Sequence, residues 1–258
     1  SPASLGKLRK IMFDICHAKE PICEPCGKKD GYYRPIQNLP SPLNWQNGES
    51  RLDSKIILPF NLREYVFIYP NTTIIVAGAK SSGKTGFLYR TVVLNMHRKV
   101  ILLSTMEGGE AQLRDRFNAM TDVVIPKPAP FEVYHVTEHF HDYIKFPDTL
   151  YVIDYLDVPE SGEFYLIAGL ISKIQRKLKE NSNAVIGLQK PYGRDLAFGG
   201  AGTINDATLY LALDSHKLKI VDAKVPADPT IIPKNMQWKF AYEDAGTKFT
   251  SISQIYGD

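Results

Sequence analysis

Residues 78–85 read Gly-Ala-Lys-Ser-Ser-Gly-Lys-Thr and constrain the fold of this chain more than any other stretch. They match the pattern G-x-x-x-x-G-K-[ST] of the phosphate-binding loop. The apolar residues 72–78 ahead of the loop are rich in β-branched side chains and predict a buried parallel strand. Residues 87–96 behind it carry apolar side chains at helical spacing. This order of strand, loop and helix predicts a nucleoside triphosphate site, and the alternative is a chance match in a polar turn.

The residue types in the loop suit the binding of phosphate. Glycines let successive backbone N–H groups face phosphate oxygens, and the start of the helix adds its dipole. We expect Lys84 to reach the β- and γ-phosphates and the Thr85 hydroxyl to ligate Mg²⁺. ATP and Mg²⁺ are therefore the expected cofactors. The expected nucleotide-binding residues are Gly78, Ala79, Lys80, Ser81, Ser82, Gly83, Lys84, Thr85 and Gly86.

Three more predicted strands end in residues that suit the same chemistry. One ends in Asp154, which we expect to orient Mg²⁺ through its water shell. Glu107 follows another and is the expected base for the attacking water, with a helix-entry glutamate as the alternative. Gln189 ends a third, near the expected γ-phosphate. Glu107, Lys84 and Gln189 form the predicted catalytic set.

The composition is that of an ordinary globular protein with room for one large core and a small appendage. Of its 258 residues, 44% are hydrophobic and 23% are charged. The net charge of +3 permits a polyanionic partner. No apolar run approaches the roughly 18 residues that cross a bilayer, so we expect no membrane partner. Three cysteines do not suggest a disulfide framework, and a reducing cytoplasm is the expected location.

Residues 1–36 predict a separate small unit. Apolar side chains recur at helical spacing first, and polar turn residues then separate two β-prone runs, which predicts a hairpin. A basic helix followed by a hairpin resembles the closing half of a winged-helix DNA-binding domain. Lys28 and Lys29 at the tip are expected to contact DNA phosphates, and the alternative is a structural cap with solvated lysines. The expected organisation is this unit over 1–36, a linker over 37–62 that ends by packing on the next domain, and an ATPase domain over 63–258.

Cysteines in the same unit raise the question of zinc. Cys23 and Cys26 form a Cys-x-x-Cys pair, and Cys16 and His17 lie nearby. The second pair is adjacent in sequence rather than spaced as a zinc knuckle. We therefore favour packed strand residues over a metal site and do not expect zinc as a partner.

The glycine-rich segment 190–202 carries basic and aromatic residues after the strand that ends in Gln189. A flexible loop of this composition is able to follow a nucleic-acid backbone and to stack an aromatic ring on a base. The expected contacts are Lys190, Tyr192 and Arg194. The alternative is a surface loop that covers the nucleotide.

From about residue 56 to residue 254, the order of motifs resembles the RecA-like ATPase core of DnaB-type replicative helicases. Residues 105–107, followed by Gln112-Leu-x-x-Arg116, resemble that family's Ser-Leu-Glu-Met segment and the helix after it. The resemblance makes Glu107 the counterpart of the catalytic glutamate and segment 190–202 that of a loop facing single-stranded DNA. It implies an α/β fold with a mostly parallel central sheet flanked by helices, here preceded by the helix-plus-hairpin unit.

One departure from the family concerns action between subunits. Family members usually carry a Lys-x-Arg pair that reaches the neighbouring subunit's nucleotide, whereas residues 224–226 read Lys-Val-Pro. Lys224 is thus the expected residue acting in trans, and the arginine is missing. The resemblance implies a homo-oligomer, and a hexameric ring follows from it only weakly.

Two functions remain open at this point. The first is an ATP hydrolase associated with single-stranded or duplex DNA, resembling a helicase and acting in DNA replication or in phage or mobile-element DNA metabolism. The second is a nucleotide-switched DNA-binding module without processive unwinding. Glu107 favours the first and the missing arginine favours the second. A small-molecule kinase is less favoured because no lid arginine cluster is evident.

Overall fold

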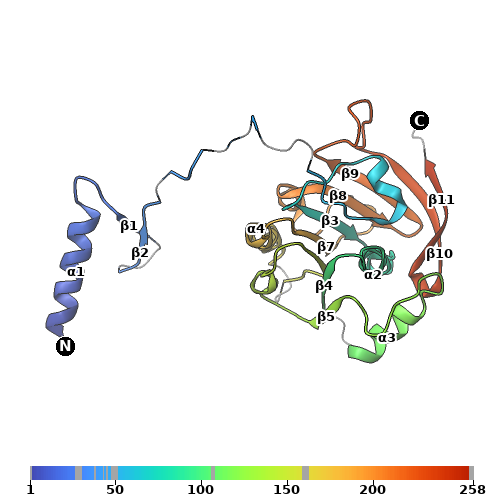
Figure 1. Ribbon diagram of the computed structural model, residues 1–258, viewed down its shortest axis with the longest axis horizontal. Helices are drawn as coiled ribbons and strands as arrows, with labels where there is room; N and C mark the ends of the chain where they lie inside the picture. The colour runs from blue at the N-terminus through green and yellow to red at the C-terminus, as the bar shows by residue number, and fades with distance from the viewer. Residues whose placement is uncertain are drawn as a thin grey trace. The chain divides into compact units, whose positions relative to one another are not determined.

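The computed structural model describes residues 2–26, 31–37, 39–42, 44, 46–47, 52–105, 108–158 and 163–255. The chain divides into two compact units, Ser1–Ser50 and Arg51–Asp258. Figure 1 labels the main helices and strands of both. No helix among the described residues combines the length and apolar character that a membrane span requires.

The first unit is a helix followed by a two-stranded hairpin. Helix α1 (Pro2–Cys16) precedes β1 (Cys23–Pro25) and β2 (Tyr33–Pro35), which pair antiparallel. This agrees with the predicted order of elements, whereas its winged-helix character stays a prediction. Lys28 and Lys29 lie outside the described residues. The Sγ atoms of Cys16 and Cys23 are 3.0 Å apart, and the described part of the chain holds no cluster of three or more side chains suited to a metal ion.

A nine-stranded sheet forms the centre of the second unit. Its strand order is β11-β10-β9-β8-β3-β7-β6-β4-β5. The strands are β3 (Thr73–Gly78), β4 (Lys99–Ser104), β5 (Glu132–His135), β6 (Thr149–Asp154), β7 (Asn183–Gln189), β8 (Ala207–Asp214), β9 (Lys217–Ala223), β10 (Gln237–Glu243) and β11 (Lys248–Ile255). The helices are α2 (Lys84–Leu94), α3 (Gly109–Asn118) and α4 (Ile167–Lys177), with 3-10 turns η1 (Pro59–Glu64), η2 (Phe140–Tyr143), η3 (Phe164–Leu166), η4 (Gly200–Ile204) and η5 (Asp244–Gly246).

Strands β3 to β8 are parallel to one another, and β9 to β11 extend the sheet from β8 by antiparallel pairing. Strand β7 lies between β3 and β6. Because parallel strands share one direction, the phosphate loop after β3, Asp154 at the end of β6 and Gln189 at the end of β7 meet at one edge of the sheet. The predicted α/β class with a mostly parallel sheet is confirmed.

Alternate side chains of the strands point into two separate cores. One core contains Ile74 and Val76 of β3 and is covered by α2, η1 and the C-terminal strands. The other contains Ile75 and Ala77 and is covered by α4 and the segment around η2. Figure 1 shows α2 and α4 beside the central strands. Burial on both faces explains why these strands read as continuous apolar runs.

The boundary of the predicted linker requires a correction. Residues 52–62 belong to the second unit, and their apolar side chains Ile56, Leu58, Phe60 and Leu62 are buried in its core. Asn95 at the end of α2 fixes this segment, since its side chain accepts from the Ile57 N–H and donates to the Ile57 carbonyl. The linker was expected to end by packing on the next domain, and this packing makes residues 52–62 part of that domain.

Candidate nucleotide site

The phosphate loop joins β3 to α2 through glycines that leave no room for side chains. A Cβ atom on Gly78 would lie 2.6 Å from Ser82 Oγ and 2.9 Å from Lys84 Cβ. One on Gly86 would lie 1.9 Å from the carbonyl oxygen of Gly246. Gly83 takes a left-handed conformation with φ of 89° at the N-terminus of α2, which glycine adopts readily. The loop therefore closes tightly around the start of the helix.

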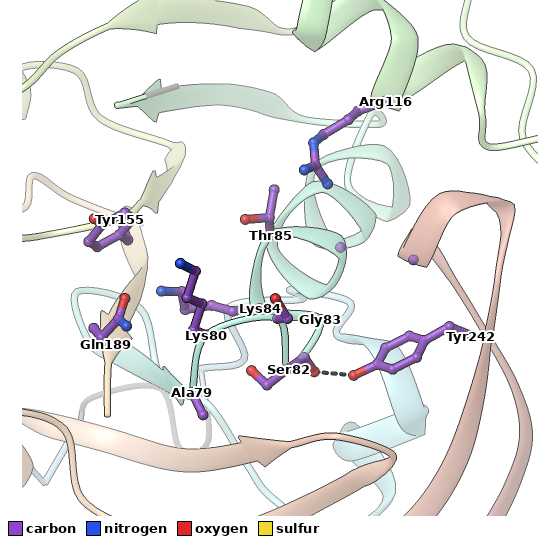
Figure 2. A pocket seen from close by; sticks show the side chains of 13 residues that line it. Ala79, Lys80, Ser82, Gly83, Lys84, Thr85, Arg116, Tyr155, Gln189 and Tyr242 are labelled. Carbon is purple, nitrogen blue, oxygen red and sulfur yellow. Dashed lines mark hydrogen bonds between the residues drawn. The ribbon is translucent and has the colours of Figure 1, made fainter. Parts of the chain in front are cut away.

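A cavity of about 730 Å³ lies over this loop, in the size range of small-molecule sites. It brings together most of the residues that the sequence placed at the nucleotide, including Lys84, Thr85 and Gln189 (Figure 2). The lining residues are Ala79, Lys80, Ser81, Ser82, Gly83, Lys84, Thr85, Gly86, Arg116, Tyr155, Gln189, Tyr242 and Gly246.

Two opposite charges lie buried beside the loop. Lys84 is 8% exposed and Asp154 is 5% exposed. Burial lowers the pKa of Lys84, although the nearby carboxylates of Asp154 and Asp157 act in the opposite direction. Burial likewise raises the pKa of Asp154, despite the attraction of Lys84 and a hydrogen bond from Thr85. For both groups the effect of burial outweighs that of the neighbouring opposite charges. Each charge is therefore only partly compensated until a charged ligand binds.

The site fits a phosphate group and a magnesium ion. Ser82 Oγ is buried and has no hydrogen-bond partner among the described residues, which is the state expected of a group that receives a ligand. Lys84 supplies a desolvated cation. The Thr85 hydroxyl lies 3.2 Å from Asp154 Oδ1, which places two of the hard oxygen ligands that Mg²⁺ prefers side by side.

Arg116 lines the cavity and was not among the predicted site residues. It comes from α3, and Figure 2 shows its guanidinium directed toward Thr85. Its charge acts on Asp154, whose pKa it lowers as a smaller effect beside burial. We find no hydrogen bond or ion pair for Arg116 within the described part of the chain. The resemblance of residues 112–116 to a helix of the helicase family could have drawn attention to Arg116, but it does not show which way the side chain points. Glu107 lies outside the described residues.

Two tyrosines were also missed. Tyr155 follows Asp154 directly, and Lys84 Nζ lies 4.2 Å from the centre of its ring. Tyr242 comes from β10 and donates its hydroxyl hydrogen to the Ser82 carbonyl (Figure 2). Adjacency to Asp154 was a signal for Tyr155. No local pattern could have found Tyr242, because it is 160 positions from its partner.

Segment 190–202 is held by specific contacts rather than free to move as the sequence suggested. The Lys190 side chain is 0% exposed, with Nζ 2.5 Å from Asp214 Oδ1 and 2.7 Å from the Arg194 carbonyl oxygen. Lys190 thus fixes the loop, and its burial removes it from the expected nucleic-acid contacts. Arg194 is exposed. Tyr192 is 71% exposed and donates its hydroxyl hydrogen to the Lys80 carbonyl at 2.9 Å.

Lys224 lies outside the cavity. It is exposed just beyond β9, and its Nζ donates to the Asn205 carbonyl oxygen at 3.0 Å. Its action on a neighbouring subunit stays a prediction.

The sequence matches no protein-family model and no curated protein. Solved structures similar to the chain include a DnaB-like replicative helicase described with its interactions with primase, at a TM-score of 0.55 and 12% identity over 80% of this chain and 65% of that chain. The ATPase domain of G40P has a TM-score of 0.51 and 14% identity over 72% of this chain and 86% of that chain. The RadB recombinase has a TM-score of 0.49 and 17% identity over 69% of this chain and 90% of that chain. The second unit has the RecA-like ATPase fold. At these identities, the likeness concerns the fold alone.

Proposed function

We propose that this chain binds ATP with Mg²⁺ and hydrolyses it in association with DNA. The observation that carries this proposal is that the phosphate loop, Lys84 and Thr85 line one cavity, with the buried carboxylate of Asp154 3.2 Å from the Thr85 hydroxyl. A site with a buried, desolvated cation and a Ser82 hydroxyl that has no partner among the described residues is suited to a polyphosphate anion. The same edge of the sheet also carries Gln189, which a simple anion site does not need.

Each residue has a role in the proposed hydrolysis. Lys84 binds the β- and γ-phosphates, and Gln189 orients the γ-phosphate end of the nucleotide. Thr85 and Asp154 hold Mg²⁺, which when bound neutralises charge on the phosphates. Glu107, just beyond β4, orients the attacking water and accepts its proton.

We propose that Arg116 supplies positive charge to the γ-phosphate from within the same chain. Arginines that stabilise the developing charge are worth several orders of magnitude in other phosphoryl-transfer sites. Replacing Arg116 with alanine is expected to lower kcat about 100-fold with a smaller effect on ATP affinity. Arg114→Ala is the matched control, because Arg114 is exposed on the same helix and does not line the cavity. Equal turnover of the two variants would remove Arg116 from the catalytic set.

The DNA association rests on the loop after β7 and on the kind of protein that shares the fold. Segment 190–202 begins directly after Gln189, so a ligand on Tyr192 or Arg194 would act close to the nucleotide. The solved neighbours include a DnaB-like replicative helicase. We propose a DnaB-type role in DNA replication or in phage or mobile-element DNA metabolism, in the cytoplasm. Lys28 and Lys29 are proposed as further DNA contacts, and Lys224 as the contact to a neighbouring subunit.

The test is steady-state ATP hydrolysis with Mg²⁺, measured alone, with single-stranded DNA and with duplex DNA at one stated salt concentration. We expect hydrolysis that single strands stimulate by about tenfold or more, because the loop that contacts DNA adjoins Gln189. Tight ATP binding without turnover in all three conditions would contradict hydrolysis. The absence of both binding and turnover would contradict the nucleotide site itself.

A further inference from the structure

Two tyrosines from distant parts of the chain bind the phosphate loop from outside. Tyr242 of β10 donates to the carbonyl of Ser82. Tyr192 of segment 190–202 donates to the carbonyl of Lys80 at 2.9 Å. The two acceptors are alternate residues of the loop, so each tyrosine holds a different peptide group.

The geometry of the peptide bond gives these contacts a consequence for the ligand. In a planar trans peptide, the C=O and the N–H point in opposite directions. A Ser82 carbonyl held by Tyr242 therefore turns the N–H of Gly83 away from that tyrosine. In the same way, Tyr192 on the Lys80 carbonyl turns the N–H of Ser81 away from segment 190–202. Ser81 and Gly83 both line the cavity, and phosphate loops bind their ligand through such N–H groups.

Tyr242 is well placed to keep its peptide group fixed. Its ring lies within 6 Å of the rings of His216, Phe240 and Phe249, measured between centroids. A Cβ on Gly83 would come within 2.4 Å of this ring, so the tyrosine packs directly on the loop backbone. Burial raises the pKa of Tyr242 to about 12, so its hydroxyl stays a donor at neutral pH.

Tyr192 acts where the backbone is strained. Ser81 has φ of 59°, a left-handed conformation that is unfavourable for a residue with a side chain. The hydrogen bond to the preceding carbonyl helps to offset that cost. The base of the segment is fixed too, because the Lys190 N–H donates to the Gly78 carbonyl and the Lys190 side chain pairs with Asp214.

We propose that Tyr242 and Tyr192 are positioning residues that orient the Gly83 and Ser81 N–H groups toward the phosphates of a nucleoside di- or triphosphate. This inference rests on the proposed nucleotide site and adds a means of pre-organising it. Tyr192 also connects that site to the loop that is proposed to contact DNA.

The experiment replaces each tyrosine with phenylalanine, which removes only the hydroxyl. Affinity for ADP is measured by calorimetry on the full chain, and the backbone amide resonances of Ser81 and Gly83 are followed by NMR with and without ADP. We expect each variant to weaken ADP binding about 3- to 10-fold, the value of one hydrogen bond. Tyr242→Phe should diminish the ADP-induced shift of the Gly83 amide and spare that of Ser81. Tyr192→Phe should do the reverse.

Two controls separate positioning from general effects. Tyr65→Phe removes the hydroxyl of a half-buried tyrosine bonded to Gln254, and Tyr165→Phe changes a tyrosine that is as exposed as Tyr192. ADP affinity and amide shifts equal to those of the controls would overturn the inference. If the tyrosine variants match the controls while wild type binds ADP and Lys84→Ala does not, the proposed function stands and the tyrosine inference falls. If wild type itself fails to bind ADP, both fall.

Discussion

Replacing Lys84 with alanine is expected to abolish ATP binding and hydrolysis, with kcat/KM falling by at least about 100-fold. Lys84 is the buried cation of the cavity, and its pKa is lowered because burial removes water from the ammonium. A polyphosphate would supply the missing compensation, so much of the binding free energy should depend on this one charge. Hydrolysis assays and calorimetry with ADP measure the two effects separately.

Lys80→Ala provides the matched control for this charge. Lys80 belongs to the same loop and lines the same cavity, but it is exposed to solvent. We expect its removal to change ADP affinity by about threefold or less, since exposed charges interact weakly through water. If Lys84→Ala hydrolysed ATP at the wild-type rate, the assignment of the whole nucleotide site would be wrong.

The parts of this site that the sequence predicts are those that local patterns determine. Strands β3, β6 and β7 are continuous apolar runs because both faces of the sheet are covered, and turn or ligand residues follow each run directly. The ends of these strands therefore locate Gly78, Asp154 and Gln189 without knowledge of tertiary structure. The phosphate loop can also be recognised from sequence alone, because its glycines and Lys84 lie in one short stretch, residues 78–85.

The parts that the sequence did not predict depend on distant contacts. Strand β11 was missed because every residue in it is half-exposed or exposed, so its pattern is weak. Tyr242 reaches the site only because β10 ends at the edge of the sheet where β3 also ends. Lys190 was expected at a nucleic-acid surface because basic residues in glycine-rich segments are usually exposed. Its pairing with Asp214 of β8 instead buries the ammonium.

Replacing Asp154 with asparagine is expected to separate activity from stability. Hydrolysis should fall by about 100-fold or more, because an amide binds Mg²⁺ less well than a carboxylate does. The same change should stabilise the protein without nucleotide and metal. Burial raises the pKa of Asp154 even with Lys84 and Thr85 acting against that effect, so the ionised carboxylate costs folding free energy. The neutral amide keeps the shape and the oxygen that Thr85 contacts at 3.2 Å.

Thermal unfolding with a chelator present tests this reasoning through its pH dependence. Because the folded-state pKa lies above the unfolded value, the penalty is fully present above the folded pKa, shrinks as the pH falls below it and is gone below the unfolded pKa. The asparagine variant should therefore unfold at a higher temperature than wild type at neutral pH, by about 2–4 °C for each kcal/mol removed. The difference should shrink in acid. Asp157→Asn, at an exposed carboxylate three residues on, should show no such gain. A variant at Asp154 that unfolds earlier than wild type at neutral pH would mean that the carboxylate stabilises the fold, as it would in a structural ion pair with Lys84.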